Sequence, residues 1–132
     1  SKGVSKSAFG IVGLETAFPL LYTYLAKSGL IPIERIIDSL AYRPREIFGG
    51  KVCNFQEGDD ASFTAFAVDG EWIIDPTTFK SKGQATPFAD WRVSAKNLLT
   101  VSHGKIVFQN GSSLKSVGRV LLFTRFDTSI TK

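Results

Sequence analysis

The sequence contains few of the side chains on which most catalytic sites depend. Its 132 residues include one histidine, His103, one cysteine, Cys53, and no methionine. A hydrolytic zinc site needs three or four converging His, Cys, Asp or Glu ligands, and carboxylates do not replace the missing imidazoles. Any Ser-His-Asp or Cys-His device would have to use His103, which we expect in a hairpin turn. Cys53 has no histidine or basic cluster beside it, so we expect a small half-buried residue and no nucleophile. The chain by itself is therefore expected to be inactive.

Other absences exclude further classes. The sixteen Lys and Arg residues give a net charge of +4 but never form a run, whereas a nucleic-acid face needs them clustered. No apolar run approaches the roughly 20 residues of a membrane span, so neither nucleic acid nor membrane is an expected partner. A single cysteine cannot form an internal disulfide and suits a reducing compartment such as the cytoplasm. Because the chain does not start with Met, we expect a processed start or a piece of a longer protein.

The composition that is present is that of a globular domain. Hydrophobic residues make up 43% and charged residues 21%, and eleven Phe are available for a core. These proportions exclude a disordered chain, and the length allows one domain with a substantial core.

A glycine-punctuated segment near the start leads into an amphipathic helix, expected over about Thr16–Lys27. Thr16 is expected to cap this helix by accepting a hydrogen bond from a first-turn N–H, and Gly29 to end it in the left-handed conformation. Its apolar stripe follows helical spacing. The stripe consists of Leu14, Ala17, Phe18, Leu21 and Leu25. The residues alone leave open whether Gly10 and Gly13 form a flexible leader or a loop that a ligand approaches closely.

A second helix is expected over about Pro32–Tyr42. Pro44 should end or bend it, because the residue before a proline avoids the helical region. One more turn is expected at Arg45–Phe48, followed by a Gly49-Gly50 joint.

From residue 51 the apolar period changes to two, which indicates strands. The expected strands are Ala61–Val68, Glu71–Asp75, Leu98–Ser102, Lys105–Gln109 and Gly118–Phe126. The Asp69-Gly70 turn predicts that Glu71–Asp75 pairs back on the strand before it. The His103-Gly104 turn predicts a second hairpin.

Two segments resemble a known family. Phe9–Thr23 (Phe-Gly-Ile-Val-Gly-Leu-Glu-Thr-Ala-Phe-Pro-Leu-Leu-Tyr-Thr) resembles the segment after the last metal-ligand region of bacterial dihydroorotases of the amidohydrolase superfamily. Phe79–Trp91 is similar to that family's Phe-x-Ser-Lys-Gly-x-x-(Ser/Thr)-Pro-Phe-x-Gly-Trp stretch, and Thr100–Val107 to the strand pair after it. The resemblance covers about residues 1–110 and fades over Ser112–Lys132. Ser62 stands where the family has Asp.

The resemblance implies a fold. The isolated chain is expected to be α+β, with residues 1–50 supplying the terminal helices of a (β/α)8 TIM-type barrel. Residues 51–132 would supply the C-terminal part of a composite β-sandwich. We expect open strand edges and an exposed apolar helix face, both of which require another polypeptide.

The resemblance also implies a function. Dihydroorotases interconvert N-carbamoyl-L-aspartate and dihydroorotate in pyrimidine biosynthesis, with a zinc centre whose ligands lie upstream of the matching region. Only one family role carries over, which is the binding of the pyrimidine ring by main-chain groups at Phe9 and Gly10. Phe9 could instead simply anchor the loop. The implied partners are the remainder of a dihydroorotase chain, a homo-oligomer or aspartate transcarbamoylase.

Two other functions stay open. One is a non-catalytic dihydroorotase-like scaffold, for example for aspartate transcarbamoylase. The other is a related hydantoinase or allantoinase.

Overall fold

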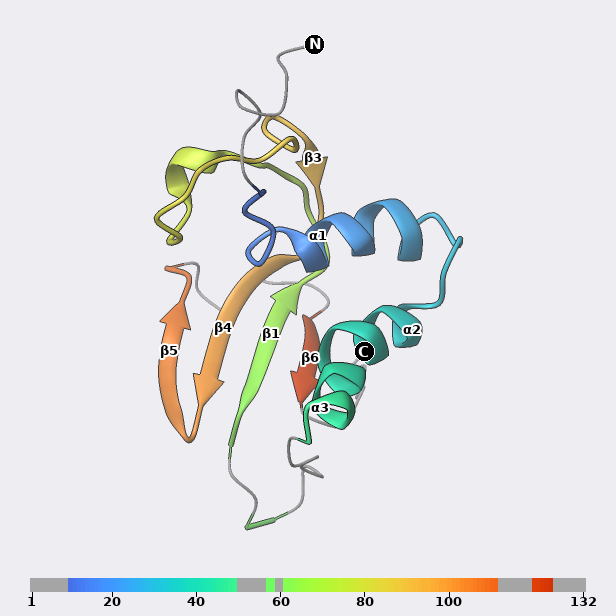
Figure 1. Ribbon diagram of the computed structural model, residues 1–132, viewed down its shortest axis with the longest axis vertical. Helices are drawn as coiled ribbons and strands as arrows, with labels where there is room; N and C mark the ends of the chain where they lie inside the picture. The colour runs from blue at the N-terminus through green and yellow to red at the C-terminus, as the bar shows by residue number, and fades with distance from the viewer. Residues whose placement is uncertain (1–9, 50–56, 59–60, 112–119, 125–132) are drawn as a thin grey trace.

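A four-stranded antiparallel sheet forms one layer of the computed structural model, which describes residues 10–49, 57–58, 61–111 and 120–124 (Figure 1). The strand order is β5-β4-β1-β6. The strands are β1 (Phe63–Ala67), β4 (Lys96–Ser102), β5 (Lys105–Gln109) and β6 (Val120–Thr124). These bounds confirm three of the predicted strands and lie within the fourth, Gly118–Phe126.

The hairpin between β4 and β5 turns at His103 and Gly104, as predicted. Both residues have positive φ, 49° and 72°, which is the geometry of the tight turn that matches strand twist. The Ser62 hydroxyl accepts a hydrogen bond from the His103 N–H at 2.9 Å, and the Gly104 N–H donates to the Ala61 carbonyl at 2.8 Å. Ser62, the departure from the family pattern, therefore ties the start of β1 to this turn.

One predicted pairing is wrong. Strand β2 (Trp72–Ile73) does not pair with β1; it forms a separate two-stranded sheet with β3 (Arg92–Val93). The Asp69-Gly70 turn does exist, with Gly70 at φ +86°. However, β1 is already paired along its length with β4 on one side and β6 on the other. No edge of β1 is left for β2, so the chain leaves the large sheet at this turn.

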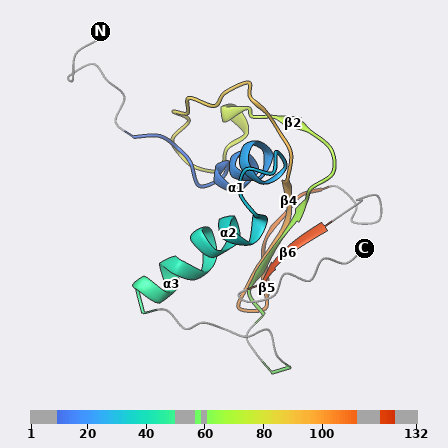
Figure 2. The ribbon, with the colours of Figure 1, turned by 90° about the vertical axis from the view of Figure 1, so that its right-hand side faces the viewer.

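The helices cover one face of the large sheet (Figure 2). They are α1 (Ala17–Leu21), which continues as the π-helical turn η2 (Tyr22–Ala26), then α2 (Ile33–Ile37), η3 (Asp38–Tyr42) and α3 (Arg43–Ile47). Pro32 precedes α2, and Gly29 adopts the predicted left-handed conformation at φ +76°. The two predicted helices are thus confirmed within a few residues.

Pro44 does not end the second helix. Arg43, directly before it, is helical at φ −56° and ψ −43°, and α3 continues through the proline. The preceding turn is π-helical, and the Arg43 N–H bonds to the Asp38 carbonyl five residues back. A proline clashes with the carbonyl four residues before it, and we attribute its tolerance here to the wider π turn.

The core lies between the helices and the sheet. Phe18 of α1 is 7% exposed, and its ring centroid lies 4.5 Å from that of Phe66 in β1. Ile36 of α2, Val68 and Ala95 complete the buried cluster. Side chains from both predicted parts of the chain, before and after residue 50, therefore share one core.

Several apolar side chains lie outside this core. Leu14 is 96% exposed, so it does not belong to the buried stripe as predicted, because it precedes the helix in a turn. Leu30, Ile47 and Phe48 are also exposed, which agrees with the expected exposed apolar helix surface. The edge strand β5 exposes both Ile106 and Val107.

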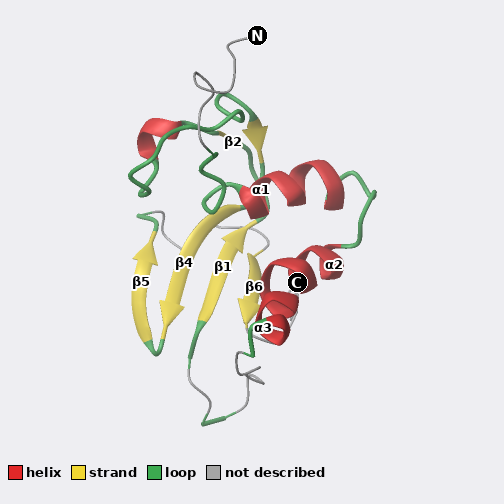
Figure 3. Cartoon of the chain, in the orientation of Figure 1, coloured by secondary structure: helices red, strands yellow, loops and turns green. Residues whose placement is uncertain are grey.

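The coarse fold class, α+β, is confirmed (Figure 3). No described helix has the length and apolar character required to cross a membrane. Phe9, Gly50 and Cys53 lie outside the described residues. Most of Ser112–Lys132 also lies outside them.

Candidate functional site

Gly10 is the one predicted substrate-binding residue that the structure describes. Its φ is +72°, and no described atom lies within 4 Å of the position that a Cβ would take. An L-residue strains this conformation, whereas glycine adopts it freely. The backbone at Gly10 is therefore exposed and turned in a way that only glycine favours.

The chain after Gly10 runs directly into α1. The Thr16 and Ala17 N–H groups both donate to the Gly13 carbonyl, at 3.1 and 2.8 Å. Thr16 holds the N-cap position, but its hydroxyl makes no capping bond. It donates instead to the Gly13 carbonyl at 3.5 Å, and the residue is fully buried. The predicted hydroxyl cap is wrong, because burial turns this side chain toward the loop carbonyl.

The segment 10–16 is joined to the second family-like segment, 79–91. The Glu15 carboxylate accepts hydrogen bonds from the Lys80 N–H at 3.0 Å, the Ser81 N–H at 2.9 Å and the Ser81 hydroxyl at 2.7 Å. The Val12 N–H donates to the Ala85 carbonyl at 2.8 Å. Two stretches about 65 residues apart in sequence thus form one unit, which we call the loop junction (residues 10–16 with 79–86).

The loop junction is also tightly packed at Gly83. A Cβ at Gly83 would lie 3.0 Å from the Val12 Cγ2 atom. The Val12 side chain therefore packs so closely against Gly83 that a larger residue at this position would require Val12 to shift.

The charge of Glu15 is stabilised by its surroundings. Partial burial raises the pKa of this carboxyl, but the bonds from the Lys80 N–H and the Ser81 hydroxyl and N–H lower it. The positive charge of Lys80 adds to the lowering, and the net direction is below the ordinary value. Successive backbone N–H groups form a small anion-binding nest, and ionised acceptors make the stronger hydrogen bonds. The carboxylate is therefore the form that suits the junction.

A second carboxylate makes the same kind of contact nearby. Asp75 accepts from the Thr77 N–H at 2.9 Å and the Thr77 hydroxyl at 2.7 Å, and caps the short 3-10 helix Pro76–Thr78. These bonds, with the hydroxyl first, lower the pKa of Asp75. Unlike Glu15, Asp75 bonds within its own segment and holds no second loop.

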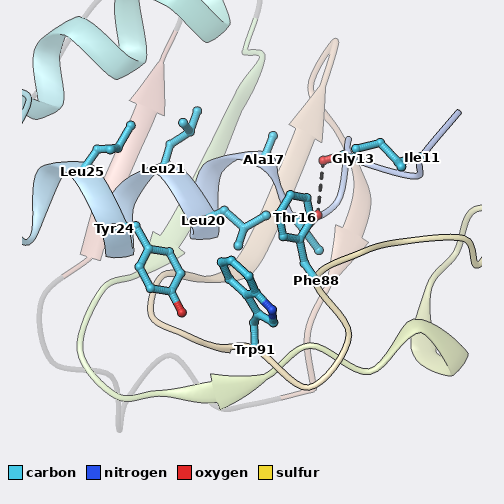
Figure 4. A pocket seen from close by; sticks show the side chains of 10 residues that line it. All are labelled: Ile11, Gly13, Thr16, Ala17, Leu20, Leu21, Tyr24, Leu25, Phe88 and Trp91. Atoms are coloured by element: carbon cyan, nitrogen blue, oxygen red, sulfur yellow. Dashed lines mark hydrogen bonds between the residues drawn. The ribbon is translucent and has the colours of Figure 1, made fainter. Parts of the chain in front are cut away.

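An apolar groove runs beside the loop junction. It has a volume of about 400 Å³ and lies between the α1–η2 helix and the segment around Phe88 and Trp91. Figure 4 shows Leu20, Tyr24, Phe88 and Trp91 on one side of the helix, with Leu21 and Leu25 on the other. The Trp91 ring packs edge to face against the rings of Tyr24 and Phe88, with distances of 5.3 and 5.2 Å between ring centroids.

The two hydroxyl groups among the side chains that line this groove bond to the protein's own backbone. The Tyr24 hydroxyl donates to the Arg92 carbonyl at 3.0 Å, and the Thr16 hydroxyl to the Gly13 carbonyl. A polar, charged ligand needs several convergent polar groups, which this groove does not offer. The groove suits apolar side chains and not a pyrimidine acid.

The described residues do not fit a metal centre. Within 10–49, 57–58, 61–111 and 120–124, no three His, Cys, Asp or Glu side chains lie close enough together to hold an ion. His103 is exposed in the β4–β5 turn. No hydrolytic step is therefore assigned to these residues.

Comparison with known proteins shows what this chain is similar to. A search of protein-family models found no match. Among solved structures, the L-hydantoinase (dihydropyrimidinase) from Arthrobacter aurescens matches 84% of this chain with a TM-score of 0.69 and 28% identity. That match covers 25% of the hydantoinase chain. The fold and the sequence thus relate this chain to a segment of the amidohydrolases.

The curated relatives are more specific. The chain is 45% identical to the dihydroorotase of Bacillus cytotoxicus and 44% identical to that of Bacillus thuringiensis, over 114 residues in each. These alignments cover 86% of this chain, which spans about a quarter, 27%, of each relative's length. The chain is related in sequence to the C-terminal part of dihydroorotases, which confirms the resemblance read from its two motifs.

Sequence reasoning missed the role of Glu15. The motif Gly-Leu-Glu-Thr was noted, but nothing local distinguishes a carboxylate that binds a remote backbone from one facing solvent.

Proposed function

We propose that this chain is the C-terminal segment of a zinc-dependent dihydroorotase, which interconverts N-carbamoyl-L-aspartate and dihydroorotate in pyrimidine biosynthesis. The observation that carries the proposal is the loop junction. The two segments that resemble the family are linked through Glu15 and Val12, with the exposed Gly10 backbone at one end. The 45% identity to a dihydroorotase supports the same assignment.

The substrate role is proposed for the main-chain groups of Phe9 and Gly10. Exposed main-chain N–H and C=O groups can pair with a flat ring that carries donors and acceptors on its edge. The exposed Gly10 backbone at φ +72° supports close approach by such a ring.

Zinc is proposed to bind in the remainder of the parent protein, where it would supply an activated water. Because the described residues hold no ligand cluster, we expect this chain alone to be inactive. This chain would bind and orient the substrate, and it would supply the last helices and strands of the parent fold.

In that parent, residues 1–50 would be the terminal helices of a (β/α)8 barrel and residues 51–132 the C-terminal part of a β-sandwich. The apolar groove beside Trp91, together with exposed Leu14 and Phe48, supports burial against the remainder of the chain. Strand β5 stands at the end of the described strand order and has exposed apolar side chains, which supports a further strand beside it.

The remaining partners are proposals of the same kind. We expect a cytoplasmic enzyme with no nucleic-acid or membrane partner, acting as a homo-oligomer or with aspartate transcarbamoylase.

A second candidate is a hydantoinase-type cyclic amidase, which the structural match to L-hydantoinase favours. Assay of the parent protein on dihydroorotate, hydantoin and allantoin separates the two. Turnover of dihydroorotate alone supports the first proposal, and turnover of hydantoin alone supports the second.

The first test is the intact mass of the protein purified from its source cells. We expect a species several hundred residues larger than this chain, containing zinc and cyclising N-carbamoyl-L-aspartate. A stable species near 14.4 kDa without a companion chain would contradict the enzyme. It would leave a binding role such as the dihydroorotase-like scaffold.

A further inference from the structure

We propose that Glu15 is a positioning residue of the substrate site: its carboxylate anchors segment 10–16 to the Lys80–Ser81 backbone and so fixes the Gly10 main chain. The inference rests on the proposed function. It goes beyond that function by giving the downstream loop, which carries no reacting group, a part in substrate binding.

The hydrogen bonds of Glu15 join two distant segments and do not cap a helix end. Glu15 begins no helix and accepts no described bond from its own segment; its three bonds all come from residues 65 and 66 positions away. A further bond, from the Val12 N–H to the Ala85 carbonyl at 2.8 Å, lies two residues from Gly10. The loop is thus attached at two points on the same side of the glycine.

Such attachment matters for binding. Main-chain groups recognise a ring only when their direction is set, and that direction must be held by the residues that support them. Glycine has the least restricted backbone of any residue, so the bonds made by the described residues after Gly10 help to set the direction of its main-chain groups.

The test uses the full-length parent protein. Glu15→Ala removes all three bonds and is expected to raise KM for dihydroorotate at least 10-fold while kcat changes less than 3-fold, because only substrate binding is lost. Glu15→Gln, whose amide NH2 would face a backbone N–H, should give a smaller rise in KM. Ser81→Ala removes one of the three donors and should raise KM about 2–5-fold in wild type but not in the Glu15→Ala background.

Asp75→Ala is the matched control. It removes two bonds of the same lengths, at 2.9 and 2.7 Å, within the neighbouring 3-10 helix. KM should stay within 2-fold of wild type. An unchanged KM in Glu15→Ala, or an equal rise in Asp75→Ala, would overturn the proposal.

Amide hydrogen exchange at Val12 separates this inference from the enzyme assignment. Faster exchange in Glu15→Ala than in Asp75→Ala is expected whether or not the parent turns over dihydroorotate. If the wild type is inactive on dihydroorotate, the proposed function fails, and this exchange decides the anchoring claim. Equal exchange in the two variants would overturn it.

Discussion

The four-stranded sheet and the region of the loop junction are held together in different ways. In the sheet, β1 is paired along its whole length with β4 and β6 through backbone ladders. Beside the junction, the α1–η2 helix contacts β3 and the residue after it, Ser94, through individual side-chain hydrogen bonds. The Thr23 hydroxyl accepts from the Ser94 N–H at 2.8 Å, and Lys27 Nζ donates to the Ser94 hydroxyl at 3.1 Å.

The better-packed region is the less regular one. Among the residues whose burial the structure describes, those with no exposed surface lie where the first helix meets the segments around β2 and β3. They are Thr16, Ile74, Val93, Ser94 and Ala95. Edge strand β5, by contrast, exposes Ile106 and Val107 at 62% each. The proposed substrate loop is therefore attached to the most deeply buried of the described residues, as a preformed binding site requires.

The largest effect is expected at the core between helix and sheet. Phe18→Ala removes a ring that is 7% exposed and packs 4.5 Å from Phe66. The free energy of unfolding of the parent protein should fall by about 3–5 kcal/mol, the usual cost of truncating a buried Phe. Urea denaturation measures it. Phe18→Leu keeps more of the apolar side chain, leaves a smaller cavity and should cost less than Phe18→Ala; equal costs would show that the ring is not packed as described.

A smaller loss of stability is expected where the α1–η2 helix contacts Ser94. Thr23→Val keeps the shape but leaves the N–H of fully buried Ser94 without the hydroxyl that it bonds. An unsatisfied buried donor costs about 1–3 kcal/mol. The control is Ser39→Ala, which removes an exposed hydroxyl bonded to the Arg35 carbonyl and should change the unfolding free energy by about 0.5 kcal/mol or less. If both variants behave alike, single side-chain bonds do not hold this region.

The smallest expected effect is the weakening of the Glu15 hydrogen bonds at acidic pH. The pKa of Glu15 in the folded protein lies below its ordinary value of 4.5. The stability that the ionised carboxylate gives to the loop junction is therefore fully present above pH 4.5. It is lost as the pH falls through the folded-state pKa. The Val12 amide should be better protected from hydrogen exchange in the wild type than in Glu15→Gln near neutral pH, after correction for the intrinsic exchange rate. The difference should vanish in acid. A difference that persists unchanged at the lowest pH would mean that the charge of Glu15, facing Lys80 and the Ser81 donors, does not secure the loop.

Local features of the sequence predicted much of this fold. Helical spacing located the two helices, and His103-Gly104 located the β4–β5 hairpin, because both depend on neighbouring residues. The partner of β2 could not be read in this way, since it depends on β4 and β6 having occupied both sides of β1. Thr16 was correctly placed at the helix start, yet its hydroxyl follows burial and not the capping preference.

The candidate site was predicted in part. The family resemblance pointed to Phe9 and Gly10, of which the structure describes Gly10. The Glu15 bonds to Lys80 and Ser81 were beyond prediction, because no local pattern selects a partner 65 residues away.

The most direct test of the account compares two glycines in the parent protein. Gly10 and Gly29 have similar φ angles, +72° and +76°, and no described atom lies within 4 Å of either Cβ position. Gly10→Ala and Gly29→Ala should therefore impose a similar backbone strain of about 1–2 kcal/mol. Only Gly10→Ala should raise KM for dihydroorotate, by 10-fold or more, while KM of Gly29→Ala stays at the wild-type value. An unchanged KM in Gly10→Ala, or the same rise in both variants, would contradict a substrate-binding role for this loop.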